Sequence, residues 1–294
     1  MAIGISGRTK VCGIFGCPVE HTFSPALHNA AFATTGLDYV YVPFEVAPCS
    51  LAAAVEAIRA LDLVGVNVTV PHKEAVLPLL DGLSEEAARI GAVNTIVNRE
   101  GYLYGDNTDG KGYLKALREA GFAPAGRTVL FLGAGGSARA VAVQLALAGA
   151  SKLVFTNRTE ARAADLARFI AEKTGIQVDL VTWPEQAGDK LPTKTLADAD
   201  LVVQATSLGM SPKVYETVPL PFASFRPGQV ASDLVYNPVE TLFLKKARLA
   251  GAVTVSGLGM LLHQGALAFE LWTGIPAPLA VMREVLKKEL FKSR

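Results

Sequence analysis

The sequence predicts an α/β fold in two domains, the first with a mostly parallel sheet and the second doubly wound. The first observation is that short apolar, β-branched runs alternate with longer segments of helical period. The second is a glycine-rich turn at residues 133–138, which stands between a strand-like run and a helix-like run. The third is length, because 294 residues fill about two domains at the usual roughly 150 residues each.

The first half of the chain predicts strands that alternate with helices. The expected strands are 11–16, 39–46, 65–70 and 92–98, and the expected helices are 24–35, 51–61 and about 111–120, after a loop at 105–110. Ser24 stands at the N-cap position with Pro25 at the first helical position, and Gly121 ends the third helix. Pro71 ends the third strand and allows a helix to start at Lys73.

A turn-rich passage at 121–127 introduces a second series of elements. The expected strands are 128–132, 152–156, 178–182, 201–205 and 230–234, and the expected helices are 137–148 and 160–173. The apolar segment 257–271 predicts a buried helix that packs back on the first domain. We therefore expect one domain at 1–112, completed by helices in 257–294, and a second at 113–256.

Composition and charge exclude several classes of protein. Hydrophobic residues make up 50% of the chain and charged residues 19%, so the chain is not intrinsically disordered. Lys and Arg number 28 against 27 Asp and Glu, and a net charge of +1 predicts no nucleic-acid partner. No apolar run reaches the roughly 18 residues of a membrane span, and residues 1–10 lack the apolar centre of a secretory signal. We expect no membrane association and a cytoplasmic location.

The cysteines and histidines predict neither a disulfide framework nor a metal site. Cys12, Cys17 and Cys49 are odd in number and include no C-x-x-C pair. The four histidines show no H-E-x-x-H pattern. We expect no metal.

The glycine-rich turn predicts a Rossmann-type dinucleotide-binding site. It matches G-x-G-x-x-G/A directly after a predicted strand and consists of Gly133, Ala134, Gly135, Gly136, Ser137 and Ala138. Gly133 permits the tight turn, Gly135 lets the backbone approach a pyrophosphate, and the N–H groups of the following helix point toward it. The alternative is a tight strand-to-helix turn without a ligand, which the flanking strand and helix disfavour.

The end of the next strand predicts NADP rather than NAD. An NAD-specific site places an Asp or Glu there to bind the ribose hydroxyls, but this chain has Asn157, Arg158 and Thr159. A guanidinium suits the 2′-phosphate of NADP, and Arg162 lies one helical turn further on. The alternative is that both arginines are solvated surface charges.

Polar side chains in the first half suggest a pocket for a small polyol. Asn67, Thr69 and Lys73 lie at the carboxyl end of a predicted strand, where ligands bind in open α/β sheets. Lys73 alone could be solvated, and Asp109 alone could be an N-cap. Amides and hydroxyls surround both in the sequence, namely Asn67, Thr69, Asn94, Thr95, Asn107 and Thr108.

From end to end, the chain resembles the shikimate dehydrogenase family. The resemblance rests on residues 16–18 and 21–28, GVNVTVPHK at 65–73, GAVNT at 91–95, NTDG at 107–110, the glycine turn, 157–159, TSLGM at 206–210, 233–238 and 257–274. It implies NADP-linked reduction of 3-dehydroshikimate to shikimate in aromatic amino acid biosynthesis. It also implies that the first domain binds substrate and that a cleft closes over both ligands.

The resemblance also implies roles for individual residues. Lys73 and Asp109 would form a catalytic pair at the reacting carbon. Thr22, Ser24, Thr69, Asn94 and Gln264 would hold the substrate's carboxylate and hydroxyls, with Asn67 and Tyr236 in support. The cofactor would contact Gly133, Ala134, Gly135, Gly136, Ser137 and Ala138 at its pyrophosphate, Asn157, Arg158, Thr159 and Arg162 at its 2′-phosphate, and Gly257 and Met260 near its nicotinamide.

Two residues depart from the family pattern. Thr22 stands where a serine is expected, and its extra methyl bears on the preference between shikimate and quinate. Gln204 stands where an asparagine is expected. One alternative function is a quinate/shikimate dehydrogenase that uses NAD, and another is a catalytically silent NADP-dependent sensor or partner-binding module. We expect a monomer or a homodimer.

Overall fold

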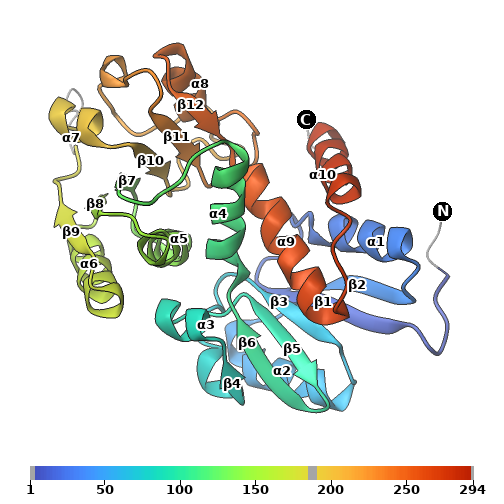
Figure 1. Cartoon of the computed structure of the whole chain (residues 1–294). Coiled ribbons are helices and arrows are strands. Elements are labelled where there is room, and N and C mark those ends of the chain that lie inside the picture. The colour runs from blue at the N-terminus through green and yellow to red at the C-terminus, as the bar shows by residue number, and fades with distance from the viewer. Residues whose placement is uncertain (1–3, 185–190, 293–294) are drawn as a thin grey trace. The chain divides into compact units, whose positions relative to one another are not determined.

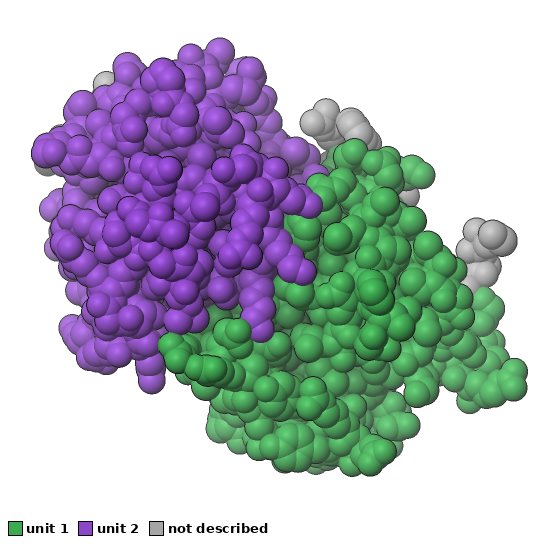
Figure 2. Space-filling model, viewed as in Figure 1, with its two compact units in different colours: residues 1–108, 262–294 green, residues 109–261 purple. Residues whose placement is uncertain are grey.

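The computed structural model describes residues 4–184 and 191–292, and the chain divides into two compact units. Unit 1 comprises Met1–Thr108 and Leu262–Arg294, and unit 2 comprises Asp109–Leu261 (Figure 2). Unit 1 is thus discontinuous in sequence, whereas unit 2 is one continuous segment. No helix among the described residues is long and apolar enough to cross a membrane.

Unit 1 is built on a six-stranded sheet in the order β2-β1-β3-β5-β6-β4 (Figure 1). Its strands are β1 (Lys10–Gly16), β2 (Tyr39–Glu45), β3 (Gly65–Val68), β4 (Gly82–Leu83), β5 (Thr95–Arg99) and β6 (Tyr102–Asp106). β1 pairs in parallel with β2 and β3, so the carboxyl ends of these three strands share one edge. β4 is parallel to β6, whereas β5 is antiparallel to both β3 and β6. Most strand pairs are therefore parallel, as expected, and the β5–β6 hairpin is an addition that the sequence did not predict.

The helices of unit 1 come from both ends of its sequence. They are α1 (Ser24–Thr35), α2 (Leu51–Ala60), α3 (Glu85–Ile90), most of α9 (Gly257–Thr273) and α10 (Leu279–Lys292), with short 3-10 helices at Pro48–Ser50 and Leu77–Leu79. α10 packs beside α1 (Figure 1). Trp272 of α9 donates from Nε1 to the carbonyl oxygen of Ile96 at 3.0 Å. The expected return of the C-terminal helices to the first domain is confirmed.

The core of unit 1 fixes the direction of the residues on β3. Val66 and Val68 are at most 1% exposed and pack in one cluster with Val55 and Ile58 of α2. Because successive side chains of a strand point to opposite faces, Asn67 faces away from this apolar cluster. The strand therefore presents one polar side chain opposite the α2 side.

Unit 2 is built on a six-stranded sheet in the order β12-β11-β10-β7-β8-β9, with all pairs parallel. Its strands are β7 (Thr128–Leu132), β8 (Lys152–Thr156), β9 (Gln177–Leu180), β10 (Leu201–Gln204), β11 (Val230–Asp233) and β12 (Val253–Val255). Counted from β7, this is the Rossmann order, with the reversal of direction between β7 and β10. Ligands bind at such a reversal, outside the carboxyl ends of the strands. The expected doubly wound domain is confirmed.

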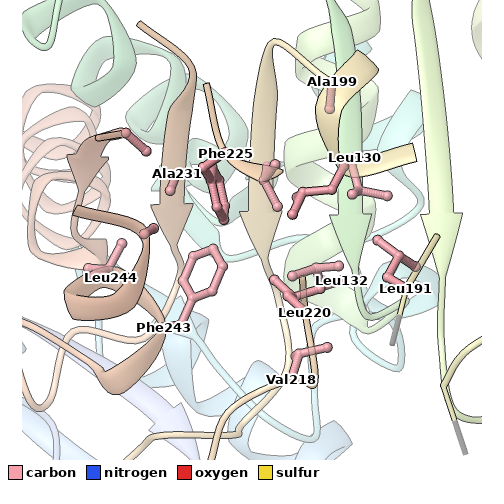
Figure 3. Close-up of a cluster of buried hydrophobic side chains, with 14 of the residues drawn as sticks. Leu130, Leu132, Leu191, Ala199, Val218, Leu220, Phe225, Ala231, Phe243 and Leu244 are labelled. Carbon is pink, nitrogen blue, oxygen red and sulfur yellow. The ribbon is translucent and has the colours of Figure 1, made fainter. Parts of the chain in front are cut away.

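Helices cover the sheet of unit 2 and close its core. They are α4 (Thr108–Glu119, which begins in unit 1), α5 (Gly136–Leu147), α6 (Glu160–Thr174), α7 (Thr193–Asp198) and α8 (Leu242–Leu249), with a short 3-10 helix at Phe222–Ser224. Figure 3 shows one buried cluster that joins Leu130 and Leu132 of β7, Ala231 of β11 and Phe243 of α8. These four side chains are at most 1% exposed. This buried cluster thus holds the central strands in place as far as their carboxyl ends.

The structure corrects two expected helix starts in unit 1. The N-cap of α1 is Phe23, and Ser24 is already helical and buried, so Ser24 is not the cap. No helix starts at Lys73. The chain forms turns there, because the His72 N–H donates to the Thr69 carbonyl and the Val76 N–H donates to the His72 carbonyl.

Helix α4 begins earlier than the expected start near Lys111. The N–H of Thr108 donates to Oδ1 of Asn94 at 2.8 Å, so a side chain distant in sequence supplies an acceptor for the first turn. Asp109 consequently lies inside the first turn. The alternative interpretation of Asp109 as the N-cap is wrong.

Candidate active site

A chain of hydrogen bonds joins the polar side chains at the carboxyl end of β3. The Tyr41 hydroxyl donates to Asn67 Oδ1 at 2.7 Å, and Asn67 Nδ2 donates to Thr95 Oγ1 at 3.1 Å. Thr95 donates in turn to Asn94 Oδ1 at 3.0 Å, and Asn94 Nδ2 donates to Thr108 Oγ1 at 3.0 Å. All five residues are buried. Their amide and hydroxyl groups are therefore fixed in orientation by one another.

Two hydroxyls precede and open helix α1. Thr22 Oγ1 donates to Ser24 Oγ at 3.1 Å and accepts from the Ser24 N–H at 3.2 Å. Ser24 is 6% exposed, and its side chain lies beside the Tyr41 hydroxyl. The two neighbouring hydroxyls can both donate hydrogen bonds to the oxygens of one carboxylate, which suits a substrate that carries this group.

The turn after β3 holds Thr69 and Lys73. Thr69 contacts the end of β1, since a Cβ added to Gly16 would collide with the Thr69 methyl group. The buried His72 ring lies 2.7 Å, through Nε2, from the carbonyl oxygen of Val46. The carbonyl oxygen of Lys73 accepts from the Val93 N–H at 2.8 Å. The half-buried Lys73 side chain thus starts from a backbone that is anchored on both sides.

Asp109 is the first residue of unit 2 and is 6% exposed. Its carboxylate lies in the first turn of α4, where the positive end of the helix dipole favours negative charge. The next residue, Gly110, allows close packing of α4 on α5, because a Cβ there would lie 2.8 Å from the Ala140 carbonyl oxygen. Asp109 is therefore held next to the helix that follows the glycine turn, while Lys73 belongs to unit 1.

Tyr41 supports the candidate site, and the sequence did not reveal it. Its ring stacks on His28 with centroids 4.5 Å apart and an interplanar angle of 13°. Burial lowers the pKa of His28 to about 3 and raises that of Tyr41 well above its usual value, so both rings are neutral near pH 7. Only the contact of the Tyr41 hydroxyl with Asn67, 26 residues away in sequence, reveals its role.

The glycine turn in unit 2 has the geometry that a pyrophosphate requires. Gly133 has φ +110°, and a Cβ there would lie 2.8 Å from the Thr206 methyl, so only glycine fits. Cβ atoms added to Gly135 and Gly136 would meet no described heavy atom within 4 Å. Both glycines and Ser137 are exposed at the start of α5, beside Ala134, whereas Ala138 is buried. The turn is thus open at Gly135 and Gly136, at the N-terminus of α5, which fits an anionic cofactor group.

The two arginines expected at the 2′-phosphate follow β8, Arg158 in the loop and Arg162 in the first turn of α6. Asn157 Nδ2 donates to the Thr159 carbonyl oxygen at 2.8 Å, which folds the loop before α6 begins at Glu160. The Arg158 and Arg162 side chains are exposed, and no described carboxylate pairs with either. Both guanidinium groups are available to a phosphate.

The remaining predicted residues lie in helix α9 and in the loop after β11. Gly257 starts α9 and must be small, because a Cβ there would lie 2.5 Å from the Leu234 carbonyl oxygen. Met260 on the same helix is 9% exposed. Tyr236 follows β11 in unit 2, and burial raises its pKa. Gln264, further along α9, is half-buried in unit 1.

The described side chains show no cluster of three or more His, Cys, Asp or Glu that could hold a metal ion. The free cysteines Cys12, Cys17 and Cys49 form no disulfide.

Three family models match the chain in the order of its elements. The shikimate dehydrogenase substrate binding domain matches residues 14–96, and shikimate / quinate 5-dehydrogenase matches residues 116–210. The shikimate 5'-dehydrogenase C-terminal domain matches residues 257–287. The first match lies within unit 1 and the second within unit 2.

Similar proteins cover the chain almost completely. A protein from Desulforamulus reducens named shikimate dehydrogenase (NADP(+)) is 53% identical over 289 residues, which are 98% of each chain. A crystal structure of a shikimate dehydrogenase in complex with NADP+ is 39% identical over 98% of each chain, with a TM-score of 0.89. A ligand-free 5-ketofructose reductase of Gluconobacter sp. strain CHM43 is also 39% identical, covers 97% of this chain and 100% of its own, and has a TM-score of 0.89. The chain belongs to the shikimate dehydrogenase family.

Proposed function

We propose that this protein catalyses the reversible, NADP-dependent reduction of 3-dehydroshikimate to shikimate, a step of chorismate and aromatic amino acid biosynthesis. The observation that carries the proposal is the hydrogen-bonded series from Tyr41 to Thr108. It holds amides and hydroxyls at the carboxyl end of β3, in a sheet whose strand pairs are mostly parallel, which suits a small ring with several hydroxyls. The 53% identity to a protein named for this activity supports the same reaction.

Unit 1 would supply most of the side chains that bind the substrate. Ser24 and Thr22 would bind the carboxylate, because their hydroxyls are 3.1 Å apart and Ser24 is held by its place in α1. Thr69, Asn94 and Gln264 would bind the ring hydroxyls, with Asn67 and Tyr236 in support. Mutual hydrogen bonds fix Asn67 and Asn94 before substrate arrives, so little ordering cost remains at binding.

The reaction needs a proton donor at the C3 oxygen of the substrate. When bound, NADPH supplies a hydride to the C3 carbon, and negative charge develops on that oxygen. The Lys73 ammonium group would give its proton to the oxygen, and the neutral amine would accept a proton in the oxidative direction. Asp109 would accept a hydrogen bond from the same hydroxyl and orient the Lys73 ammonium group.

Unit 2 would select the cofactor. Gly133, Gly135 and Gly136 leave room at the start of α5 for the pyrophosphate, and Ala134, Ser137 and Ala138 complete this turn. Arg158 and Arg162 would bind the 2′-phosphate, with Asn157 and Thr159 shaping the loop between them. Gly257 and Met260 would lie near the nicotinamide. The division into a substrate-binding domain at 1–112 with 257–294 and an NADP-binding domain at 113–256 belongs to the same proposal.

Three further predictions from the sequence accompany the proposal. They are a cytoplasmic location, an enzyme that works as a monomer or homodimer, and activity without a metal ion. Gel filtration with light scattering would measure the oligomeric state, and assays after chelator treatment would test the metal independence.

A steady-state assay of the purified chain tests the proposal. Shikimate and quinate are each offered with NADP and with NAD, and 5-ketofructose is offered with NADPH because one similar structure is a 5-ketofructose reductase. We expect the highest kcat/KM for shikimate with NADP. Preferred turnover of quinate with NAD would favour the first alternative, and NADP binding without turnover of any substrate would favour the silent sensor.

A further inference from the structure

Gln204, the residue that departs from the family pattern, closes the loop after β10. It is the last residue of the strand and is 1% exposed. Its Oε1 accepts from the Thr206 N–H at 2.6 Å and from the Thr206 hydroxyl at 2.7 Å. Its Nε2 donates to the Leu208 carbonyl oxygen at 2.9 Å. One amide thus binds three groups of the loop and fixes its conformation.

Thr206, which Gln204 holds by two hydrogen bonds, also packs against the glycine turn. β10 pairs directly with β7, so the residues that follow these two strands are neighbours at the reversal of the sheet. A Cβ on Gly133 would lie 2.8 Å from the Thr206 methyl and 3.0 Å from the Ala205 carbonyl oxygen. The glycine turn therefore packs against the loop after β10, whose conformation Gln204 fixes.

On its other side, Gln204 reaches the loop after β11. Its Nε2 lies 3.5 Å from Oδ1 of Asp233, which also accepts from the Val235 N–H at 2.9 Å. Asp233 Oδ2 accepts from the Thr241 hydroxyl at 2.6 Å. The segment fixed in this way packs on the start of α9, because a Cβ on Gly257 would lie 2.8 Å from the Val235 carbonyl oxygen.

We propose that Gln204 is a positioning residue for the cofactor, which fixes Thr206 beneath the glycine turn and, through Asp233, the segment that packs on Gly257. Both ends of the cofactor site in unit 2 then depend on one buried amide. An asparagine is one methylene shorter and cannot keep both sets of contacts from the same backbone position. This inference rests on the proposed use of NADP.

The test compares two buried glutamines of the same sheet in the full-length protein. Gln204→Asn is the variant of interest. Gln229→Asn is the matched control, because Gln229 is also 1% exposed and makes comparable bonds, from Nε2 to the carbonyl oxygens of Leu196 and Ala199 at 2.6 and 2.7 Å. Gln229 lies just before β11, at the opposite edge of the sheet from the glycine turn. Binding of NADPH alone is measured by its fluorescence, and Tm is measured for each variant.

We expect Gln204→Asn to weaken NADPH binding by roughly tenfold and to raise the KM for NADP by a similar factor, with the KM for shikimate unchanged. Gln229→Asn should lower Tm and leave the Kd for NADPH unchanged. If both variants lower Tm alike and bind NADPH like the wild type, Gln204 is merely structural and the inference is wrong. A wild type that does not bind NADPH would overturn the proposed function as well, so the two failures are distinct.

Thr206→Ser keeps the test decisive if Gln204→Asn does not fold. It retains the hydroxyl and N–H that Gln204 binds and removes only the methyl group that contacts Gly133. We expect a native-like Tm and a rise of about two- to fivefold in the Kd for NADPH, as for the loss of one buried methyl contact. An unchanged Kd would show that the glycine turn does not depend on this loop.

Discussion

The two halves of the candidate site use different parts of the polypeptide. In unit 1 the amides and hydroxyls of the series from Tyr41 to Thr108 are buried, and each is oriented by a hydrogen bond to the next, whereas Lys73 is half-buried. In unit 2 the cofactor-facing surface is mostly backbone, at glycines without Cβ atoms, flanked by exposed arginines. Gln204 and Asp233, the buried side chains proposed to position the cofactor, lie beneath this surface. Binding a small polyol that carries a carboxylate requires fixed side-chain donors and acceptors, whereas a pyrophosphate needs only open N–H groups and positive charge.

The largest expected effect is at the reacting carbon. Because Lys73 is proposed to act on the transition state, Lys73→Ala should lower kcat by roughly 10²- to 10⁴-fold and change the KM for shikimate much less. Steady-state kinetics measure both constants, with a thermal melt to show that the variant is folded. Turnover near the wild-type rate would remove Lys73 from the mechanism.

The next effect concerns the free energy of unfolding and is expected at Asp233, a buried side chain beneath the proposed cofactor surface. Burial raises the pKa of Asp233 from 3.8 to about 7, and the hydrogen bonds from Thr241, the Val235 N–H and Gln204 offset only part of this increase. A raised pKa means that the folded state holds its proton more tightly. The stabilisation is complete below pH 3.8 and is lost as the pH rises to about 7.

Asp233→Asn removes this titration. The wild type should lose free energy of unfolding relative to the variant between pH 4 and pH 8, by up to about 2–4 kcal/mol. Urea titrations at four or five pH values measure the difference. Parallel stability curves for both proteins would mean that Asp233 ionises with an ordinary pKa.

Cofactor selection should be separable from the rest of unit 2. Arg158→Ala ought to lower kcat/KM for NADP by roughly 10- to 150-fold, because a hydrogen bond to a charged phosphate is lost, and to leave NAD almost unaffected. Added salt should weaken NADP more than NAD in the wild type. Equal losses with both cofactors would make the arginine structural.

The Tyr41 hydroxyl tests the buried network of unit 1, because it bonds Asn67 and lies beside Ser24 but is not itself proposed to bind the substrate. Tyr41→Phe leaves Oδ1 of Asn67 without its 2.7 Å donor but keeps the stacking on His28. We expect the KM for shikimate to rise by roughly 5- to 30-fold with the Kd for NADPH unchanged. A KM for shikimate equal to that of the wild type would mean that substrate binding does not depend on the bond that orients Asn67.

The smallest effect is at Thr22. Thr22→Ser keeps the hydroxyl that bonds Ser24 and removes a methyl from the carboxylate end of the pocket. If that methyl excludes the additional hydroxyl of quinate, the ratio of quinate to shikimate turnover should rise by about threefold or more. An unchanged ratio would place the discrimination elsewhere.

Short-range patterns predicted much of the fold and of the cofactor half. Strand 128–132, the glycine turn and the helix after it follow one another in sequence, and the structure has β7 and α5 there. The hairpin β5–β6 was missed because Gly105 and the polar residues after it resemble a loop, yet β6 pairs along its whole length. The short elements α7, α8 and β12 were also missed, since three to eight residues carry little periodicity.

Long-range contacts explain the rest. No periodicity shows that Tyr41 bonds Asn67, that Asn94 supplies the acceptor where α4 begins, or that Gln204 reaches Asp233. Each of these partners is 14 or more residues away in the sequence. The positions of Lys73 and Thr69 at a strand end were predictable, but the turn that replaces the expected helix depends on the backbone bonds around His72. The roles of these residues stay predictions until the variants are measured.

The discontinuity of unit 1 bears on the order in which the chain can fold during synthesis. Its sheet is finished by residue 106, but Trp272, which bonds the Ile96 carbonyl, and helix α10, which covers α1, come from the C-terminal part. Unit 2 is contained in residues 109–261 and has all six strands before α9 is complete. A growing chain can therefore close the core of unit 2 while one face of the first sheet still lacks its cover. Phe269 packs against Phe32 of α1 and Trp272 packs against Tyr41 of β2 only after the C-terminal part has been synthesised. Until then these apolar side chains lack that cover, and transiently exposed apolar surface favours aggregation.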